Sequence, residues 1–359
     1  MKKVILSLLA AGSMSVVYAQ SNTFSINQAG NNNQAPVIQQ GSANTGSLSV
    51  MGDNNISSVN QYGNTNKGNL SITGNGNQSE IMLYGSLNDA TVTQTGNGNT
   101  GQASSISGDA NQISVSQLGD NNAGYAFSSY GSNNKANVSQ TGSNNYGAAY
   151  SFYSTNSEAV VTQMGSNNSG AASSESAYGD KVSLMQTGNR NQGLSYSSNT
   201  SYNVVTHIQT GDDNRGYVDA YYGSNNQLSL TQTGNSNTGE VLSYSGSNNQ
   251  ISVSQTGNQN IASAYHYYGD NSQISITQQG NTNEARLWQE EGSSNIATVS
   301  QTGTSNTLWG LESSANPYFA TQKGDGNVMT VSQTGDGNLL RIGQTGNNNI
   351  ATVTQGSLN

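Results

Sequence analysis

The sequence predicts an all-β fold, a two-sheet β-solenoid of about fifteen strand-turn-strand rungs with about 30 short strands in a cross-β, amyloid-like stack. Three observations lead to this prediction. Glutamine recurs at a constant spacing of 23 residues from Gln94 to Gln301. Polar and apolar residues alternate with a period of two before each of these glutamines. No segment shows the i, i+3, i+4 apolar pattern of a helix.

The glutamines mark the repeat unit of the chain. Over residues 94–301 each opens a Gln-x-Gly-x-x-Asn segment, and on either side of this region the interval is 11 residues. Nine equal intervals cannot arise from composition by chance, so we expect a single tandem-repeat domain over residues 20–359. The glutamines at the 23-residue spacing are Gln94, Gln117, Gln140, Gln163, Gln186, Gln209, Gln232, Gln255, Gln278 and Gln301.

The residues before Gln117 illustrate the predicted strand. Asn111, Ile113, Val115 and Gln117 alternate with polar residues, which is the pattern of a strand with one buried face. Stacked rungs would bury the aliphatic columns, while Asn and Gln columns at the edges would form amide ladders, each side chain donating to one neighbour and accepting from the other. Loss of one ladder glutamine should cost ~1–3 kcal/mol. The predicted ladder asparagines are Asn88, Asn111, Asn134, Asn226, Asn249 and Asn295.

A second strand type alternates with the first in the 23-residue region. Its inward positions hold Asn, then Gly or Ala, then a small apolar residue, and usually Ser, as at Ser128, where the first type has Gln. Its outward positions often hold Tyr, whereas those of the first type are mostly Ser and Thr. A glycine two residues after each glutamine permits a positive φ in the turn. These turn glycines are Gly96, Gly119, Gly142, Gly165, Gly188, Gly211, Gly234 and Gly257.

The N-terminal residues have the parts of a secretory signal. Lys2 and Lys3 form a basic start, residues 4–11 are apolar, and a cleavage site follows Ala19, so we predict a signal peptide over residues 1–19. The apolar run falls well short of the ~20 residues that span a bilayer, which argues against a membrane anchor. Of the 10 basic residues, 8 then remain against 19 acidic ones, a net charge of −11. This charge argues against nucleic acid as a partner.

Both ends of the mature chain are predicted to be open strand edges. The strand pattern begins as soon as the mature chain does and continues almost to its last residue, without a segment that resembles a cap. Uncapped cross-β edges add further strands, so we expect head-to-tail polymerisation of the chain with itself. The residues of the two polymer ends are Asn22, Phe24, Ile26, Gln28, Asn349, Ala351, Val353 and Gln355.

The inward Asn-x-Φ-x-Φ-x-Gln strand followed by x-Gly-x-x-Asn resembles the repeat of the curlin family, whose members form curli, the extracellular amyloid fibres of bacterial biofilms. The resemblance implies secretion through an outer-membrane channel to the bacterial cell surface, a nucleator subunit as a partner, and roles in adhesion and matrix rigidity. The last rungs carry only Arg341 as a basic residue, which favours the major fibre subunit over the more basic nucleator. The motif recurs at Gln28, Gln39, Gln61, the ten glutamines named above, Gln322, Gln333 and Gln344.

The amino-acid composition is also compatible with other classes of protein. Only 32% of residues are hydrophobic and 8% charged, against roughly 45–50% and about 25% in a typical globular domain. A disordered polar linker fits these values, but it would not keep Val and Ile at alternate positions, on one face of every predicted strand. A soluble ice-binding solenoid needs regular hydroxyls, which Thr91 and Thr93 offer but most outward positions do not. A carbohydrate-binding solenoid remains a second alternative, through exposed pairs such as Tyr221 and Tyr222.

Catalytic and metal-binding functions are not expected, and neither is a cofactor. A polysaccharide-cleaving β-helix needs paired carboxylates in a cleft. The adjacent pairs Asp212 and Asp213, and Glu290 and Glu291, fall in turns of regular rungs instead. A calcium-binding solenoid would need aspartates at a regular spacing. The chain has no Cys, which excludes disulfides, thiolate metal sites and cysteine nucleophiles.

The two histidines take positions in the repeat. His207 lies in an inward position where Val or Ile is expected, and His266 lies in the Ser or Gln position of the second strand type. We expect buried neutral side chains, hydrogen-bonded to their neighbours, and no pairing of the two into a metal site.

Overall fold

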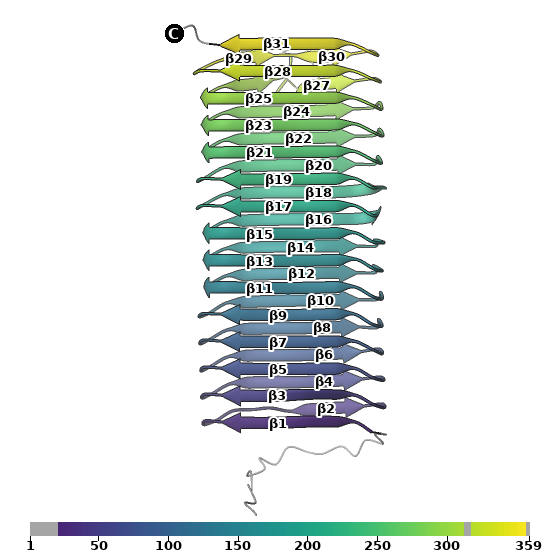
Figure 1. Cartoon of the computed structure of the whole chain (residues 1–359), viewed down its shortest axis with the longest axis vertical. Coiled ribbons are helices and arrows are strands. Elements are labelled where there is room, and N and C mark those ends of the chain that lie inside the picture. The colour runs from purple at the N-terminus through teal and green to yellow at the C-terminus, as the bar shows by residue number, and fades with distance from the viewer. Residues whose placement is uncertain (1–20, 312–316, 357–359) are drawn as a thin grey trace, which may run out of the picture.

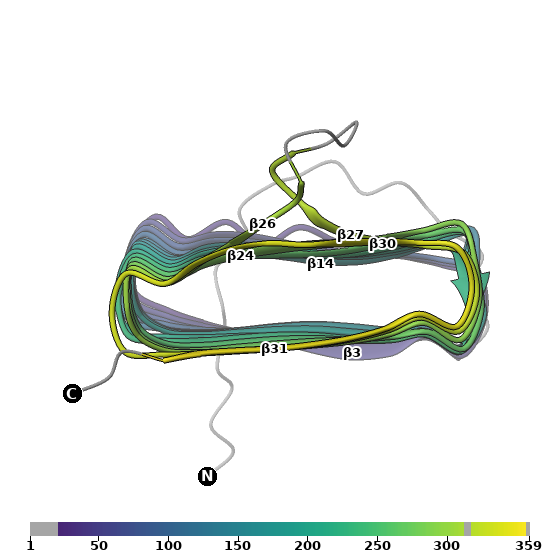
Figure 2. The ribbon, with the colours of Figure 1, turned by 90° about the horizontal axis from the view of Figure 1, so that it is seen from above.

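The computed structural model describes residues 21–311 and 317–356, and its 31 regular elements are all β-strands. The predicted signal peptide lies outside these ranges. Successive strands coil around one long axis and lie in two flat layers, as seen from the side (Figure 1) and along the axis (Figure 2). The described part of the chain contains no helix with the length and apolarity that crossing a membrane requires. The predicted all-β solenoid is confirmed.

Sheet 1, as we call the first layer, contains the strands of the first type. Its fifteen strands are all parallel. In order along the axis they are β1 (Thr23–Ala29), β3 (Thr45–Met51), β5 (Lys67–Thr73), β7 (Asp89–Thr95), β9 (Gln112–Leu118), β11 (Lys135–Ser143), β13 (Glu158–Ser166), β15 (Lys181–Asn189), β17 (Val204–Thr210), β19 (Gln227–Thr233), β21 (Gln250–Asn258), β23 (Gln273–Asn281), β25 (Ile296–Thr304), β28 (Val328–Thr334) and β31 (Ile350–Gly356).

Sheet 2 contains the intervening strands, again all parallel to one another. It has sixteen strands, of which the last four are short. They are β2 (Val37–Gln40), β4 (Ile56–Tyr62), β6 (Gln78–Tyr84), β8 (Thr100–Ile106), β10 (Ala123–Ser129), β12 (Tyr146–Phe152), β14 (Ser169–Glu175), β16 (Gln192–Ser201), β18 (Arg215–Ser224), β20 (Thr238–Tyr244), β22 (Ile261–Tyr267), β24 (Glu284–Glu290), β26 (Thr307–Trp309), β27 (Ala320–Lys323), β29 (Leu339–Arg341) and β30 (Gly343–Thr345).

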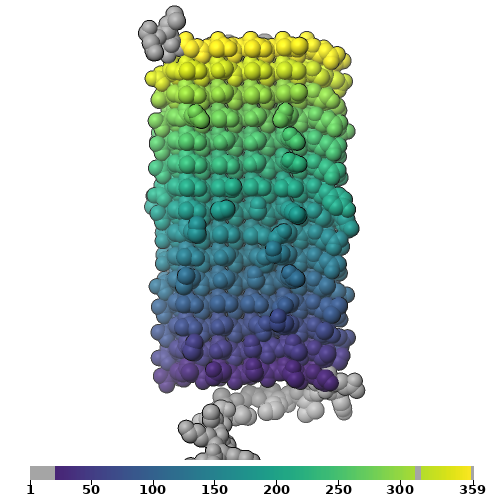
Figure 3. Space-filling model, viewed as in Figure 1, coloured from purple at the N-terminus to yellow at the C-terminus, as the bar shows by residue number. Residues whose placement is uncertain are grey.

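The core lies between the two sheets and consists of columns of like residues. Val115 of β9 pairs with Val138 of β11, and each is 1% exposed. Across the core, Ala126 of β10 is fully buried. A fully buried Val contributes about 1.5–3 kcal/mol, so a thin core repeated on every rung stabilises a long stack. The outward side chains also line up in columns along the axis (Figure 3).

The turns stack as closely as the strands, which is why glycine recurs in them. Gly119 has a φ of 115°, and a Cβ added there would lie 2.0 Å from the carbonyl oxygen of Gly142 in the next turn. Only glycine adopts this conformation without strain and permits so close an approach of two backbones. The glycine spacing in the sequence therefore reports direct contact between successive turns.

One rung departs from the regular coil. Leu308 pairs with Ala285, and Ala320 pairs with Leu287, so eleven residues stand where the neighbouring strand has one. The described ends of this segment, between β26 and β27, project outward from sheet 2 (Figure 2). The register on both sides is unchanged, and stacking continues to β31.

Candidate functional site

The glutamine column of sheet 1 is a continuous chain of side-chain hydrogen bonds. Nε2 of Gln117 donates to Oε1 of Gln140 over 2.8 Å and also to the carbonyl oxygen of Thr100, at the start of β8, over 2.8 Å. Each amide therefore joins two rungs and the two sheets. The same step between side chains is 2.8–3.0 Å long throughout Gln94, Gln117, Gln140, Gln163, Gln186, Gln209, Gln232, Gln255, Gln278 and Gln301.

Glutamine ladders also reach the ends of the stack. In sheet 1 the chain continues from Gln301 through Gln333 to Gln355, with steps of 2.7 and 2.8 Å. In every step the side chain nearer the N-terminus donates, so the ladders have one direction along the axis. Sheet 2 has shorter ladders of the same direction, which are Gln39–Gln61 near β1 and Gln289–Gln322–Gln344 near β31.

The predicted ladder asparagines bond mainly to the backbone rather than to one another. Nδ2 of Asn111 donates to the carbonyl oxygen of Gly131 over 3.0 Å, and its Oδ1 accepts the backbone N–H of Asn134 over 2.9 Å. The side chain is one methylene shorter than that of Gln and lies where strand and turn meet, so its amide reaches the adjacent turn. The column contains Asn88, Asn111, Asn134, Asn226, Asn249 and Asn295, of which Asn295 has an Nδ2 without a hydrogen-bond partner.

The predicted turn glycines all adopt the same backbone conformation. Their φ angles lie between 108° and 120°. Each follows a ladder glutamine by two residues and so fixes the position at which the chain leaves sheet 1. They are Gly96, Gly119, Gly142, Gly165, Gly188, Gly211, Gly234 and Gly257.

The two ends of sheet 1 are edge strands. Within the described residues β1 has one strand neighbour, β3, and β31 has one, β28. The inward side chain of Ile26 on β1 is 53% exposed, whereas Leu48, its partner on β3, is 1% exposed. An apolar column thus reaches the surface at this end. The predicted end residues lie in or next to these edge strands: Asn22, Phe24, Ile26 and Gln28 at β1, and Asn349, Ala351, Val353 and Gln355 at β31.

The histidines are buried in different sheets, as their places in the repeat indicate. Nδ1 of His207 lies 3.4 Å from Oγ of Ser195, but its Nε2 has no hydrogen-bond partner, and neither ring nitrogen of His266 has one. The expected set of hydrogen bonds is therefore incomplete. Burial lowers the pKa of His207 to about 3 and that of His266 to about 4, because burial penalises the charged form.

The asparagine column also contains a buried carboxylate, Asp180, that was not among the predicted site residues. Asp180 is 0% exposed and accepts the backbone N–H of Asn203 over 2.9 Å. It also accepts hydrogen bonds from Oγ of Ser197, over 2.7 Å, and from Oγ1 of Thr200. The signal was available, because Asp180 stands 23 residues before Asn203, in the position of the ladder asparagines.

The adjacent carboxylate pairs form ion pairs between rungs instead of a cleft. Asp213 is bound by Arg190 over 2.7 Å, and Glu291 by Lys323 over 3.0 Å. The part of the chain that the structure describes contains no group of three or more His, Asp or Glu side chains that could hold a metal ion. These contacts link neighbouring turns and provide no arrangement for acid–base chemistry.

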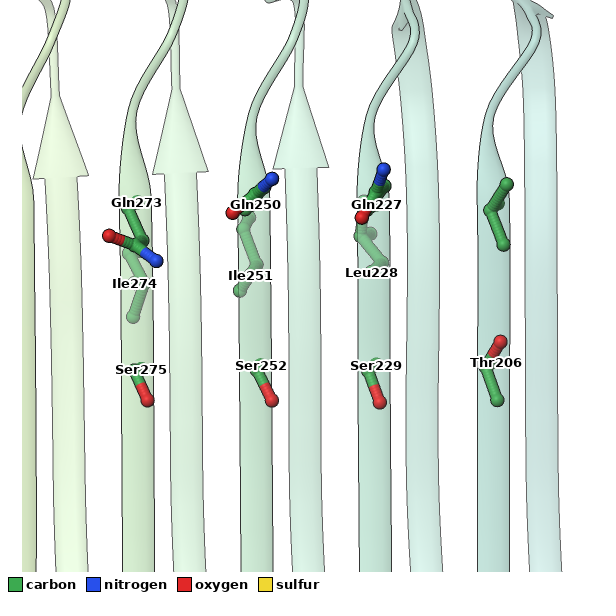
Figure 4. Close-up of a pocket in the computed structure, with 11 residues that line it drawn as sticks. Thr206, Gln227, Leu228, Ser229, Gln250, Ile251, Ser252, Gln273, Ile274 and Ser275 are labelled. Carbon is green, nitrogen blue, oxygen red and sulfur yellow. The ribbon is translucent and has the colours of Figure 1, made fainter.

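A shallow depression of about 270 Å³ lies on the outer face of sheet 1 (Figure 4). It runs over successive rungs, and none of its lining side chains is ionisable, so it offers no acid or base for catalysis. Its labelled residues repeat from rung to rung: Thr206, Ser229, Ser252 and Ser275, with Gln227, Gln250 and Gln273, and with Leu228, Ile251 and Ile274.

Tyrosine rings on the outer side of sheet 2 contact one another along the axis. The ring centroids of Tyr221 and Tyr244 are 5.3 Å apart, and those of Tyr244 and Tyr267 are 5.6 Å apart. Tyr222 and Tyr268, in the adjoining turns, are about half exposed. The stacked rings therefore stabilise neighbouring rungs through ring–ring contacts.

The repeat that builds these ladders matches a known family. A family profile described as the curlin associated repeat matches residues 108–150, 203–234, 223–257, 269–303 and 324–356. No curated protein matches the chain. Each matched stretch includes at least one strand of sheet 1 with its ladder glutamine and the glycine turn that follows. The resemblance seen in the sequence is confirmed, and the chain carries curlin associated repeats in five matched stretches.

Proposed function

We propose that the mature chain is the major structural subunit of an extracellular, curli-like amyloid fibre and that it polymerises end to end. Curlin repeats in a β-solenoid indicate a curli-type structural subunit rather than an enzyme. The observation that carries the proposal is the pair of edge strands. β1 and β31 lie at opposite ends of an in-register parallel sheet, and each has a single described neighbour.

The chemistry of the edges supports addition of further strands. A parallel edge strand presents free backbone N–H and C=O groups, which pair readily with another strand. The exposed inward side chain of Ile26 would be buried by such addition. The fibre would lie at the bacterial cell surface, where it would support the biofilm matrix and adhesion, and its assembly would use a nucleator subunit and an outer-membrane secretion channel as partners.

Dilution of the mature chain from denaturant tests the proposal. We expect unbranched fibres that bind amyloid dyes and give a meridional reflection at ~4.7–4.8 Å. A matched pair of variants separates edge stacking from other aggregation. Val353→Lys places a charge in an inward position of β31 and should abolish fibres, whereas Thr354→Lys places it in the neighbouring outward position and should leave them intact.

A chain that stays monomeric for days at micromolar concentration would contradict the proposal. Fibres formed equally by both lysine variants would show that β31 is not the growing edge. Thermal hysteresis by a soluble monomer, or binding of a polysaccharide by it, would favour instead the ice-binding or carbohydrate-binding solenoid.

A further inference from the structure

The two sheets contain different numbers of levels. Sheet 1 has fifteen strands. In sheet 2, β26 and β27 lie end to end beside β24, and β29 and β30 lie end to end on the next level. Sheet 2 therefore has fourteen levels, and a strand of sheet 1 lies outermost at both ends of the stack (Figure 1). The described solenoid thus consists of fourteen full turns and one additional half turn, the last strand of sheet 1.

This half turn matters when two copies meet. If a second copy kept the orientation of the first, its β1 would pair with β31, but its β2 would lie two strand spacings, about 9.6 Å, from β29 and β30. The junction would then lack one strand in sheet 2, and buried side chains on either side would face a gap. If the second copy is rotated by half a turn about the long axis, the coil continues without a gap.

From this count we infer that successive subunits of the fibre are related by a half-turn rotation about its axis. This inference rests on the proposed end-to-end fibre and specifies its contact. The rotated copy places β1 on β29 and β30, and β2 on β31. Strands of the two sheets run in opposite directions (Figure 1), and a half turn reverses the direction of β1, so that it pairs in parallel with sheet 2.

The inward residues of the joined strands match in this arrangement. Because the strands pair in register, β31 sets its inward residues against those of the β2 segment as like against like. β29 and β30 set theirs against the inward residues of β1, with a single difference. The pairs are Asn349 with Asn33, Ala351 with Ala35, Val353 with Val37 and Gln355 with Gln39, and Asn338 with Asn22, Leu340 with Phe24, Ile342 with Ile26 and Gln344 with Gln28.

In the unrotated arrangement the inward side chains match less well. The large ring of Phe24 lies against Ala351, and the side-chain columns of sheet 2 have no partner at the junction. In the rotated arrangement Phe24 meets Leu340, and the half-exposed Ile26 meets Ile342. Buried columns of similar side-chain volume continue across the junction, as they do within the chain.

The amide ladders continue across the rotated junction with their direction preserved. Within the chain each inner ladder glutamine donates to a backbone carbonyl and to the next glutamine. Gln355 donates only to the carbonyl oxygen of Leu339, over 3.0 Å, and Gln344 only to that of Val328, over 3.0 Å. Since each inner glutamine also donates to the glutamine on the next level, Gln355 and Gln344 can do the same at a junction. In the rotated arrangement Gln39 follows Gln355 and Gln28 follows Gln344 in their columns, and the Oε1 atoms of Gln39 and Gln28 can accept these hydrogen bonds.

Disulfide cross-linking distinguishes the two arrangements, because the chain has no Cys. Register partners on adjacent strands lie about 4.8 Å apart, within the Cα range of a disulfide. Thr354→Cys with Ile38→Cys should link rotated copies, and Thr354→Cys with Asn27→Cys should link unrotated ones. All three positions are exposed, so folding should not change. The two ends of one chain are about 70 Å apart, so links form only between copies.

We expect oxidised fibres of the first variant to dissolve into a ladder of covalent oligomers on a non-reducing gel, and fibres of the second to dissolve into monomers. Thr345→Cys with Ala29→Cys, across sheet 2, should behave like the first variant. Each single-cysteine variant controls for lateral links between fibres. Fibres that cross-link through the second variant, or through neither variant, would contradict the half-turn rotation. They would not contradict the proposed end-to-end fibre. Absence of fibres in the unmodified chain would overturn both.

Discussion

Nε2 of Gln117 lies 2.8 Å from Oε1 of Gln140, although the two residues are 23 positions apart in the chain. Gln140 in turn donates to Gln163 over 2.8 Å and to the carbonyl oxygen of Ala123 over 2.9 Å. Gln140 is 1% exposed, so water does not replace either partner. The ladder is a row of buried amides that satisfy one another, and its loss at one rung leaves unpaired groups on the two neighbouring rungs.

Replacing Gln140 by Ala should therefore lower the free energy of unfolding by about 1–3 kcal/mol, because Gln117 loses an acceptor and Gln163 loses a donor. Gln112→Ala is the matched control, since that side chain is exposed on β9 and its loss should change stability by less than about 0.5 kcal/mol. Midpoints of unfolding in guanidinium chloride measure both. Equal midpoints for the two variants would show that the ladder does not stabilise the stack.

One turn offers a comparison between two glycines. A Cβ on Gly74 would lie 1.9 Å from the carbonyl oxygen of Gly96, whereas a Cβ on Gly76 would meet no atom within 4 Å. Gly76→Ala has only the left-handed conformation to accommodate, at about 1–2 kcal/mol. Gly74→Ala must also separate two rungs, at a cost on the order of 3 kcal/mol or more. The same denaturation midpoints test this order, and a reversed order would contradict the turn contact.

The histidines should make the stack sensitive to acid. Their pKa values in the fold, about 3 and about 4, lie below the ordinary value of 6.5, so below that value the unfolded chain takes up protons that the folded chain does not. The contribution of the histidines to stability is full at neutral pH and falls as the pH drops below about 6.5, towards 4 for His266 and towards 3 for His207. At pH 5 each histidine should lower the free energy of unfolding by about 2 kcal/mol relative to pH 7.

Substitutions that fit the columns test this pH dependence. His207→Leu continues the column of Leu184 and Leu230, and His266→Ser continues the serine position of Ser243. The double variant should lose less stability between pH 7 and pH 5 than the original chain, as measured by guanidinium midpoints at the two pH values. The same loss in both chains would mean that carboxylates, and not these histidines, set the acid sensitivity.

Asp180→Asn should raise the stability of the fold at pH 7. The carboxylate is buried in a column of asparagines, and a neutral amide removes the cost of burying its charge while Oδ1 still accepts the backbone N–H of Asn203. We expect a gain of about 1 kcal/mol. Asp109→Asn, in an exposed turn, is the control and should change little. A loss of stability would show that the hydrogen bonds from Ser197 and Thr200 outweigh the cost of burial.

The sequence predicted the parity of the strands well, because inward and outward positions differ at every second residue and a repeat reinforces the signal. The inward places of Val115 and Gln117 followed from that alternation. The partners of the Asn111 amide did not follow from it, since they depend on how closely strand and turn approach each other. Asp180 was missed because its role depends on the column in which it stands, not on its residue type.

Two further features could not be predicted from periodicity. The segment between β26 and β27 interrupts the spacing of the repeat. The repeat itself does not tell at which residue the chain departs from sheet 2. The half-turn mismatch between the sheets depends on the level of each strand, and a strand count cannot give it because β26 and β27 share a level. Both features follow only from the register of the paired strands in the structure.

The described residues between β26 and β27, next to each strand, project outward from sheet 2 and would give the proposed fibre a regular decoration. Each subunit carries one such projection, and the neighbouring strands keep their register around it. Fifteen strands fix the subunit length at about 70 Å. With the half-turn rotation, projections would stand about 70 Å apart on alternating faces and about 140 Å apart on each face. A peptide or enzyme grafted into this segment would then be displayed along the filament at intervals set by the number of rungs.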